Sequence, residues 1–288
     1  PLQDEPNRPA PHPLSAGDGR SLPGRGLLFF PSSHVPLFIS QNREKRKKEI
    51  DESCRTAYNE TDLERNGSVE HMRIATAEQM RTLDRRAIEE RGVPSLELME
   101  RAANALAEAA IDTAANAPGR AVCFCGPGNN GGDGVACARL LLEAGFEVRC
   151  ILVGQREKLT CDTRAMEARL AAAGGVLEPF TPDDPDFAAW CLKADVMVDA
   201  IFGIGLNTEV RGDALTAVHM MNTCDIPVVS ADIPSGVEAD TGRVLGEGVR
   251  AARTVTFTLP KAGHYVGKGG LCTGVLTVAD IGIPRDLV

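Results

Sequence analysis

The chain has 288 residues, of which 43% are hydrophobic and 25% are charged, and its formal charge at pH 7 is −9. It is long enough to bury a substantial core, and its composition is that of a soluble globular protein. The negative charge argues against a nucleic-acid partner held by phosphate neutralisation, but it allows a small anionic ligand bound through backbone dipoles. Because no apolar run approaches the roughly 20 residues of a membrane span, we expect no membrane association.

The cysteines indicate a cellular compartment. There are nine, and they form no pair of Cys-x-x-Cys motifs, which argues against a zinc ribbon. Several lie inside apolar runs, where a free cysteine behaves as a small hydrophobic residue. We therefore expect a reducing compartment, the cytoplasm.

The N-terminal quarter differs from the rest of the chain. The first 36 residues contain eight prolines, and a basic cluster follows at 43–48. A localisation signal or a tether to an anionic surface would suit that cluster, but composition favours a solvated, disordered tail over 1–70. Acidic residues at positions 4, 5 and 18 argue against a mitochondrial transit peptide.

Helical patterns begin after residue 75. Thr76 starts a capping box, and apolar residues then recur at helical spacing as far as Ile88. Gly92 and Pro94 end this predicted helix, and Ser95 begins a second one.

From residue 121 onward, strand and helix patterns alternate. We expect strands at 121–125, 148–153, 196–202, 228–233, 253–259 and 274–281. We expect helices between the earlier strands, at 134–144, 160–173, 186–194 and 213–222. Nearly continuous apolar strands that alternate with helices are typical of parallel sheets covered on both faces. The prediction for 71–288 is one α/β domain, a three-layer Rossmann-like sandwich with a mostly parallel central sheet and helices on both faces.

Polar and glycine-rich segments follow four of these strands, at 126–134, 199–206, 232–236 and 259–263. In a parallel sheet, ligands bind in the crevice outside the carboxyl ends of the strands. We therefore expect these segments to converge on one site. The meeting of four such segments at one edge of the sheet is stronger evidence for a ligand site than any one of the motifs.

The segment after the first strand satisfies a dinucleotide fingerprint, Gly126-x-Gly128-x-x-Gly131. Its glycines permit close backbone approach, and the following helix offers free N–H groups to a phosphate. However, the second strand ends at Val153-Gly154-Gln155-Arg156, without the acidic residue that binds a ribose in dehydrogenases. An NAD(P)-dependent oxidoreductase is therefore disfavoured but remains an alternative.

Oxygen-bearing side chains come together at the same predicted edge. Asp199 and Asp232 each end a strand, and with Asn130 and Ser235 they form a candidate oxygen-ligand cluster for a hard cation. The competing interpretation of each aspartate is capping of the following turn. Ser235 lacks the sequence context of a nucleophile elbow.

Two further residues in the last of these loops are ambiguous. Lys261 is interpreted either as a partner for a phosphate oxygen or as a solvated loop lysine. His264 is expected to be a surface or packing residue.

The motifs together resemble the YjeF N-terminal domain family. The resemblance spans about residues 80–284 and rests on Met80-Arg81-x-Leu83-Asp84-Arg85, Pro94-Ser95-Leu96-x-Leu98-Met99-Glu100, Gly126-x-Gly128-Asn129-Asn130-Gly131-Gly132-Asp133-Gly134, Val198-Asp199-Ala200-Ile201-Phe202-Gly203-x-Gly205-Leu206 and Asp232-Ile233-Pro234-Ser235-Gly236. It implies an isomerase, an NAD(P)H-hydrate epimerase, which interconverts the R and S epimers of hydrated NADH and NADPH (NADHX and NADPHX). This metabolite-repair reaction supplies a separate S-specific dehydratase.

The same resemblance implies a set of site residues. A potassium ion would be held by Asn130, Asp199 and Ser235. The hydrated dinucleotide would contact Asn129, Asn130, Gly131, Gly132, Asp133, Gly203, Ile204, Gly205, Leu206, Asn207, Thr208, Glu209 and Asp232. Epimerisation requires the hydroxyl to leave and return, or the ring to open, and we take Asp232 as the catalytic carboxylate that moves the proton.

The resemblance also suggests partners. A homodimer is usual in the family, and the dehydratase is a functional partner or a fused domain. Residues 279–284 resemble the junction that leads into the dehydratase in many bacterial relatives, so the chain is either a stand-alone epimerase or half of a bifunctional enzyme. The alternative function is a non-catalytic dinucleotide-, RNA- or protein-binding module of the same fold, such as an RNA-decay scaffold or a lipoprotein-binding protein. Its scaffold form predicts erosion of motifs that are intact here.

Overall fold

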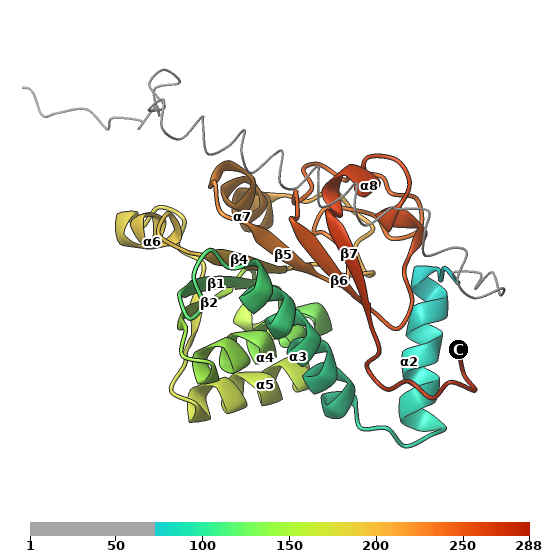
Figure 1. The fold of residues 1–288 in the computed structure, drawn as a ribbon. Helices are drawn as coiled ribbons and strands as arrows, with labels where there is room; N and C mark the ends of the chain where they lie inside the picture. The colour runs from blue at the N-terminus through green and yellow to red at the C-terminus, as the bar shows by residue number, and fades with distance from the viewer. Residues whose placement is uncertain (1–72) are drawn as a thin grey trace, which may run out of the picture. The chain divides into compact units, whose positions relative to one another are not determined.

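The computed structural model describes residues 73–288, and the predicted disorder of 1–70 lies outside them. The described chain is built around one sheet of seven parallel strands in the order β3-β2-β1-β4-β5-β6-β7 (Figure 1). The strands are β1 (Arg120–Cys125), β2 (Glu147–Leu152), β3 (Leu177–Pro179), β4 (Val196–Ala200), β5 (Val228–Ala231), β6 (Arg253–Phe257) and β7 (Val275–Ala279). The predicted α/β fold is confirmed, with every strand pair parallel.

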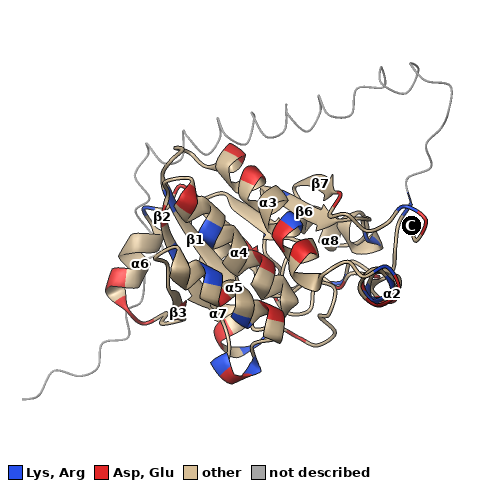
Figure 2. Cartoon of the chain, turned by 90° about the horizontal axis from the view of Figure 1, so that it is seen from below, with Lys and Arg blue, Asp and Glu red and all other residues tan. Residues whose placement is uncertain are grey.

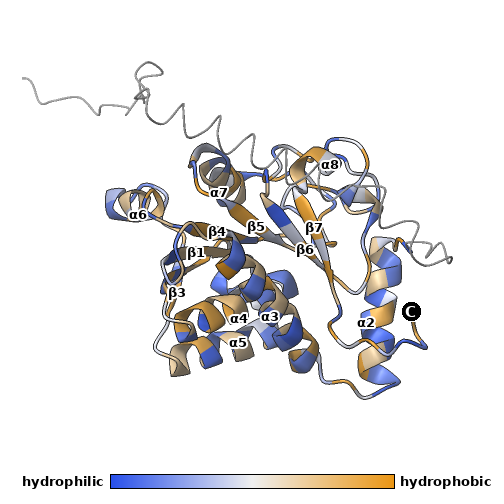
Figure 3. Ribbon diagram, in the orientation of Figure 1, coloured by the Kyte–Doolittle hydropathy of each residue, from blue (hydrophilic) through white to orange (hydrophobic). Residues whose placement is uncertain are grey.

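The helices are α2 (Ala77–Glu89), α3 (Ser95–Thr113), α4 (Asn129–Glu143), α5 (Cys161–Ala172), α6 (Pro185–Cys191), α7 (Gly212–Thr223) and α8 (Gly269–Cys272). Short 3₁₀ turns lie at Arg156–Lys158 and Ala262–His264. Hydrophobic residues run along the strands, whereas the helices carry mixed faces (Figure 3). Charged residues lie mainly on helices and at strand ends (Figure 2).

Strand alternation produces two cores, one on each face of the sheet. In β1, Ala121, Cys123 and Cys125 face the core shared with α3, α4 and α5, whereas Val122 and Phe124 face the core shared with α6 and α7. All five residues are fully buried. Side chains of successive residues point to opposite faces of a strand, so a strand buried on both faces is apolar throughout. This explains why the strand segments could be predicted from the sequence.

Helix α2 stands apart from these layers, at the side of the sheet that carries β6 and β7 (Figure 1). Thr76 caps it by accepting a hydrogen bond from the Gln79 N–H, and the Gln79 side chain returns the bond, as predicted. The chain before α2 is anchored to the loop after β6, where the Ala75 N–H donates to the Pro260 carbonyl at 2.9 Å. This anchoring brings α2 next to the carboxyl ends of the central strands.

The structure differs from the predicted elements in three respects. Helix α4 begins at Asn129, five residues before the predicted start, so the polar segment 129–133 is the first turn of the helix rather than a loop. The edge strand β3 was missed because it has three residues and only Leu177 is buried. The predicted strands β4, β5 and β6 are each two residues shorter at the C-terminal end, where the chain turns into the site.

Candidate active site

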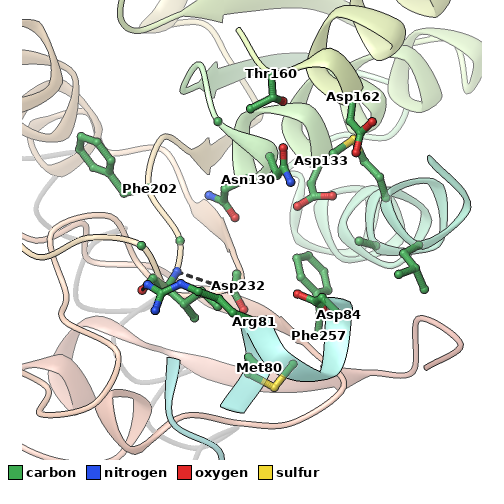
Figure 4. Close-up of a pocket in the computed structure, with 18 of the residues that line it drawn as sticks. Met80, Arg81, Asp84, Asn130, Asp133, Thr160, Asp162, Phe202, Asp232 and Phe257 are labelled. Carbon is green, nitrogen blue, oxygen red and sulfur yellow. Dashed lines mark hydrogen bonds between the residues drawn. The ribbon is translucent and has the colours of Figure 1, made fainter. Parts of the chain in front are cut away.

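A cavity of about 610 Å³ lies at the carboxyl ends of β1, β4, β5 and β6, the edge at which the sequence predicts a site. Helices α2 and α3 form its outer wall through Met80, Ile88, Leu98 and Met99. The opposite wall comes from the α4 N-terminus, the 201–206 segment, Asp232 and Lys261. Figure 4 shows polar side chains from both walls directed into this space. The cavity is therefore lined by apolar and polar side chains together, and Arg81 and Asp84 bring polar groups from the α2 wall.

The N-terminus of α4 forms one end of the polar wall. Gly128 caps the helix, and Asn129, Asn130 and Asp133 line the cavity. The exposed backbone N–H groups at this end suit a phosphate. Gly131 and Gly132 do not line the cavity. A Cβ on Gly131 would collide with the Gly126 carbonyl, so glycine allows α4 to start directly against the end of β1.

Asp232 is the central polar residue of the cavity. One carboxylate oxygen accepts hydrogen bonds from Lys261 Nζ at 2.6 Å and from Thr256 Oγ1 at 3.3 Å, and the other accepts from the Ile204 N–H at 3.2 Å. Burial opposes ionisation of Asp232, but the adjacent Lys261 ammonium outweighs it and lowers the pKa of the carboxyl. Asp232 is therefore an ionised group held from three directions. Its backbone has a φ of 61°, in the left-handed region that side-chain-bearing residues seldom adopt.

The interpretation of Lys261 as a solvated loop lysine was wrong, because its side chain is 1% exposed. Its ammonium group donates to Asp232, to Thr256 Oγ1 at 2.8 Å and to the Phe257 carbonyl at 3.4 Å. Its pairing with a phosphate oxygen stays a prediction. The residue lines the floor of the cavity as the counter-charge of Asp232.

His264 is buried. Of its two expected roles, surface residue and packing residue, the structure therefore supports the second. Its Nδ1 accepts from the Lys261 N–H at 3.0 Å, so Nε2 carries the proton and donates to the Asp232 carbonyl at 2.8 Å. Burial lowers the pKa of His264, and the neutral imidazole joins the loops that follow β5 and β6. It thereby fixes the backbone of both members of the Asp232–Lys261 pair.

Two of the predicted potassium ligands, Asp199 and Ser235, lie behind the cavity wall. Asp199 and Ser235 are fully buried, and Ser235 Oγ donates to Asp199 Oδ1 at 2.5 Å. Asp199 Oδ2 accepts from Ser230 Oγ and from the Ser235 N–H, both at 2.8 Å. Burial raises the pKa of Asp199, although these hydrogen bonds oppose the shift. Among the described residues this carboxyl group has no basic partner, so a bound cation would offset the cost of its burial.

Asn130 approaches the same region from α4. Its Oδ1 lies 3.1 Å from the position that a Cβ on Gly203 would occupy, and its buried Nδ2 has no hydrogen-bond partner among the described residues. Ser235 Oγ accepts from the adjacent Phe202 N–H at 2.9 Å. Asn130 and Ser235 therefore both border the 202–203 segment. Carboxylate, amide and hydroxyl oxygens together fit a hard monovalent cation better than a soft metal.

The predicted substrate segment 203–209 is divided by the structure. Gly203, Ile204, Gly205 and Leu206 line the cavity. Asn207, Thr208 and Glu209 are exposed and do not belong to its lining. Arg81 on α2 donates to the Ile204 carbonyl at 3.1 Å, which ties this segment to the opposite wall.

Asp84 belongs to the Met80–Arg85 motif, but the sequence alone predicts no role for it in the site. Asp84 lies on α2 and lines the cavity together with Asp133 and Asp232 (Figure 4). Burial raises the pKa of Asp84 to about 6; the Asp232 charge adds to the shift and Lys261 opposes it. Burial and the same acidic neighbours raise the pKa of Asp133 well above its usual range. The placement of α2 depends on tertiary packing, so helical periodicity alone could not have revealed this role.

Comparison with known proteins identifies the family. The model of the YjeF-related protein N-terminus matches residues 95–263, more than half of the chain. The chain belongs to the YjeF-related N-terminus family. Within the match lie the α4 N-terminus, Asp199, Asp232 and Lys261, whereas α2 with Asp84 precedes it.

Members of this family are similar to the chain over most of the described residues. An NAD(P)H-hydrate epimerase of Weissella koreensis is 40% identical over 216 residues, which cover 74% of this chain and 93% of the relative. A bifunctional NAD(P)H-hydrate repair enzyme (Nnr) of Moorella thermoacetica is 41% identical over 225 residues, 75% of this chain. The match covers only 42% of that relative, so the chain spans about two fifths of the bifunctional protein.

A solved structure supports the fold assignment. The crystal structure of the yeast protein ynu0 (YNL200c) superposes with a TM-score of 0.63 at 23% identity, covering 75% of this chain and 92% of the yeast chain. No helix among residues 73–288 combines the length and apolar character needed to cross a membrane.

Proposed function

We propose that the chain is an NAD(P)H-hydrate epimerase, which interconverts the R and S epimers of NADHX and NADPHX. The observation that carries the proposal is the cavity in which a helix N-terminus suited to a phosphate and the ionised Asp232 share one wall. Relatives about 40% identical that bear the epimerase name, and that the chain nearly spans, support the same activity.

The residues of the polar wall divide the task. The N–H groups at the start of α4 would bind the pyrophosphate, beside Asn129 and Asn130. Asp232 would face the hydrated ring and take up or return the proton that moves during epimerisation. Lys261 would keep Asp232 ionised, and the 203–206 segment would border the ring. Contacts of Gly131, Gly132, Asn207, Thr208 and Glu209 with the substrate stay predictions.

We also propose a potassium ion held by Asn130, Asp199 and Ser235. When bound, it would neutralise the buried Asp199 carboxylate and stabilise the backbone around Phe202 and Gly203. The hydrogen-bonded pair of Asp199 and Ser235, together with Asn130 Oδ1 beside the adjacent Gly203, supports this assignment.

The partners and the compartment are part of the same proposal. The functional partner is the S-specific dehydratase, either separate or fused, and the bifunctional relatives support this association. A cytoplasmic location suits the eight described cysteines, all of which are free thiols. The expected homodimer is tested by measuring the mass of the purified protein in solution.

The deciding experiment uses both hydrate epimers. An acid-generated mixture is given to an S-specific dehydratase with its nucleotide until recovery of reduced-nicotinamide absorbance stalls. Adding this protein in potassium buffer should restart recovery as the R epimer is converted. Asp232→Asn should slow the restart by roughly 10²–10⁴-fold, the usual contribution of a positioned proton-transfer group.

The controls separate chemistry from folding. Asparagine keeps the shape of the Asp232 side chain, and circular dichroism checks that the variant is folded. Asp225→Asn removes an exposed carboxylate outside the cavity and should leave the rate unchanged. Failure of the folded wild-type protein to exceed the spontaneous rate would reject the epimerase and favour a binding module of the same fold.

A further inference from the structure

Three carboxyl groups from three separate elements line the cavity. Asp84 comes from α2, Asp133 from α4 and Asp232 from the turn after β5, and Figure 4 shows them around the same space. Asp232 accepts three hydrogen bonds, only one of them at Oδ2, whereas Asp84 and Asp133 make no hydrogen bond or ion pair with any described residue. No group of three or more His, Cys, Asp or Glu side chains in the described part of the chain has the geometry of a metal site. Asp84 and Asp133 therefore present free carboxyl groups to the contents of the cavity.

We infer that Asp84 is a second catalytic proton-transfer residue of this site, working across the cavity from Asp232 on the hydroxyl of the hydrated nicotinamide ring. This inference rests on the proposed epimerase function. It adds to that function because a carboxylate held in place on one side of a bound ring does not reach its opposite face. Asp84 reaches the cavity from the α2 wall, whereas Asp232 is fixed on the sheet edge.

The environments of the carboxyl groups favour Asp84 over Asp133 for this role. A group that both gives and takes a proton works best when its pKa lies near the operating pH. Burial raises the pKa of Asp84 to about 6, with a further upward contribution from Asp232 and an opposing one from Lys261. Burial and both acidic neighbours also raise the pKa of Asp133, but Asp133 lies on α4, on the same wall as Asp232, whereas Asp84 faces the cavity from α2. Asp162 on α5 is the remaining acidic residue of the lining.

The chemical step balances with these two groups. Protonated Asp84 donates its proton to the ring hydroxyl while the carbon–oxygen bond breaks and its electron pair leaves with water. The lone pair of the ring nitrogen forms the carbon–nitrogen double bond. Water then adds to the opposite face of the same carbon and gives one proton to the Asp232 carboxylate. The reverse conversion begins from the resulting state, with Asp84 ionised and Asp232 protonated, and proton exchange with solvent reconnects the two states.

The test compares Asp84→Asn and Asp84→Glu with the wild type, using separated epimers and subtracting the spontaneous rate at each pH. We expect Asp84→Asn to lower kcat by roughly 10²–10⁴-fold with little change in KM, because a proton-transfer group acts mainly in the transition state. Asp84→Glu should regain part of the loss. Glu89→Gln is the matched control, since Glu89 is exposed on the same helix and lies outside the cavity lining.

The pH profile distinguishes proton transfer from a structural role. In the wild type, kcat/KM should fall as the pH rises above about 6, where Asp84 loses its proton, and this limb should be absent in Asp84→Asn. In ¹⁸O-water, each wild-type conversion should place the heavy isotope in the hydroxyl group.

Three results would overturn the inference in an active wild-type enzyme. They are an unchanged kcat in folded Asp84→Asn, a pH limb that persists in that variant, and epimerisation that retains the original oxygen. A wild-type protein without epimerase activity would instead reject the proposed function, so the two failures are distinguishable.

Discussion

Replacing Lys261 with methionine tests whether the ion pair with Asp232 controls both the stability of the fold and the charge of the site. The two side chains are 1% and 10% exposed, and Lys261 Nζ lies 2.6 Å from Asp232 Oδ1. Methionine fills a similar volume without the charge. The variant would leave an ionised carboxylate buried without its counter-charge.

The burial of the Asp232–Lys261 pair determines how much stability the variant should lose. Removing one partner of a buried ion pair costs about 3–5 kcal/mol, because the remaining charge is not compensated. With a urea m-value of about 2 kcal/mol/M, the unfolding midpoint should drop by roughly 1.5–2.5 M at pH 7.5. The double variant Lys261→Met/Asp232→Asn should regain much of this loss because it removes both charges.

The stability that Lys261→Met loses relative to the wild type should depend on pH, and the direction follows from the pKa of Asp232. In the wild type the pKa of Asp232 is lowered, so its contribution to stability is present above the ordinary carboxyl pKa and is lost only as the pH falls through the lowered value. Without Lys261, burial should raise the pKa of Asp232 above its unfolded value. The variant should then gain up to about 1.4 kcal/mol per unit of pH decrease between those two values. The difference in the free energy of unfolding between the wild type and the variant should therefore become smaller from pH 7.5 to pH 5.

Urea unfolding followed by circular dichroism at both pH values provides the measurement. Lys268→Met, which removes an exposed lysine a few residues further along the chain, should change the midpoint little. A deficit below about 1 kcal/mol, the range of an exposed pair, would refute the argument. A deficit that stays constant or grows on acidification would also refute it.

Three further predictions concern other parts of the site. Gly131→Ala should prevent stable folding because its Cβ would meet the Gly126 carbonyl. Gly128→Ala, whose Cβ would have nothing within 4 Å, should cost only about 0.5–1 kcal/mol as an N-cap change, and urea unfolding compares the two variants. Thermal melts should show a higher Tm in KCl than in LiCl at equal ionic strength, and Asp199→Asn should abolish the difference; equal melting in both salts for the wild type would contradict the potassium proposal. Because burial lowers the pKa of His264, the free energy of unfolding of the wild type should decrease as the pH falls below about 6.5. In urea unfolding at several pH values, His264→Gln should remove this part of the pH dependence. An unchanged slope of the free energy of unfolding against pH in the variant would contradict the prediction.

The parts of the fold that sequence predicted are those decided by local pattern or by burial on both faces. The capping box at Thr76 involves residues three apart, so it can be recognised without tertiary structure. The start of α4 was misplaced because glycine has a low helix propensity, and the segment after Gly128 contains several. Close packing of Gly131 on Gly126, and of Gly134 on Cys125, outweighs that propensity.

The parts of the site that sequence missed depend on contacts between distant residues. Lys261 lies in a Pro-Lys-Ala-Gly segment typical of an exposed loop, and its burial is decided by Asp232, 29 residues away. Asp84 belongs to a helix whose apolar face was predictable, but its position over the cavity depends on how α2 docks. Residues 201–206 line the cavity, as expected for a segment that directly follows a central strand, whereas the predicted contacts at 207–209 lie outside the lining.

The contacts of Asp232 argue against the capping interpretation that the sequence left open. A capping side chain would accept a hydrogen bond from the turn that follows it. If capping were its only role, asparagine or glycine would also be suitable, since either adopts the observed backbone φ of 61° at lower cost. Instead, its carboxylate contacts Ile204, Thr256 and Lys261, which lie at least 24 residues away along the chain. The fold thus accepts a strained backbone and buries an ammonium group to maintain one anion at the cavity wall. Strain of this kind is concentrated at functional sites, and this arrangement is the expected one for a carboxylate that must remain ionised until it receives a proton.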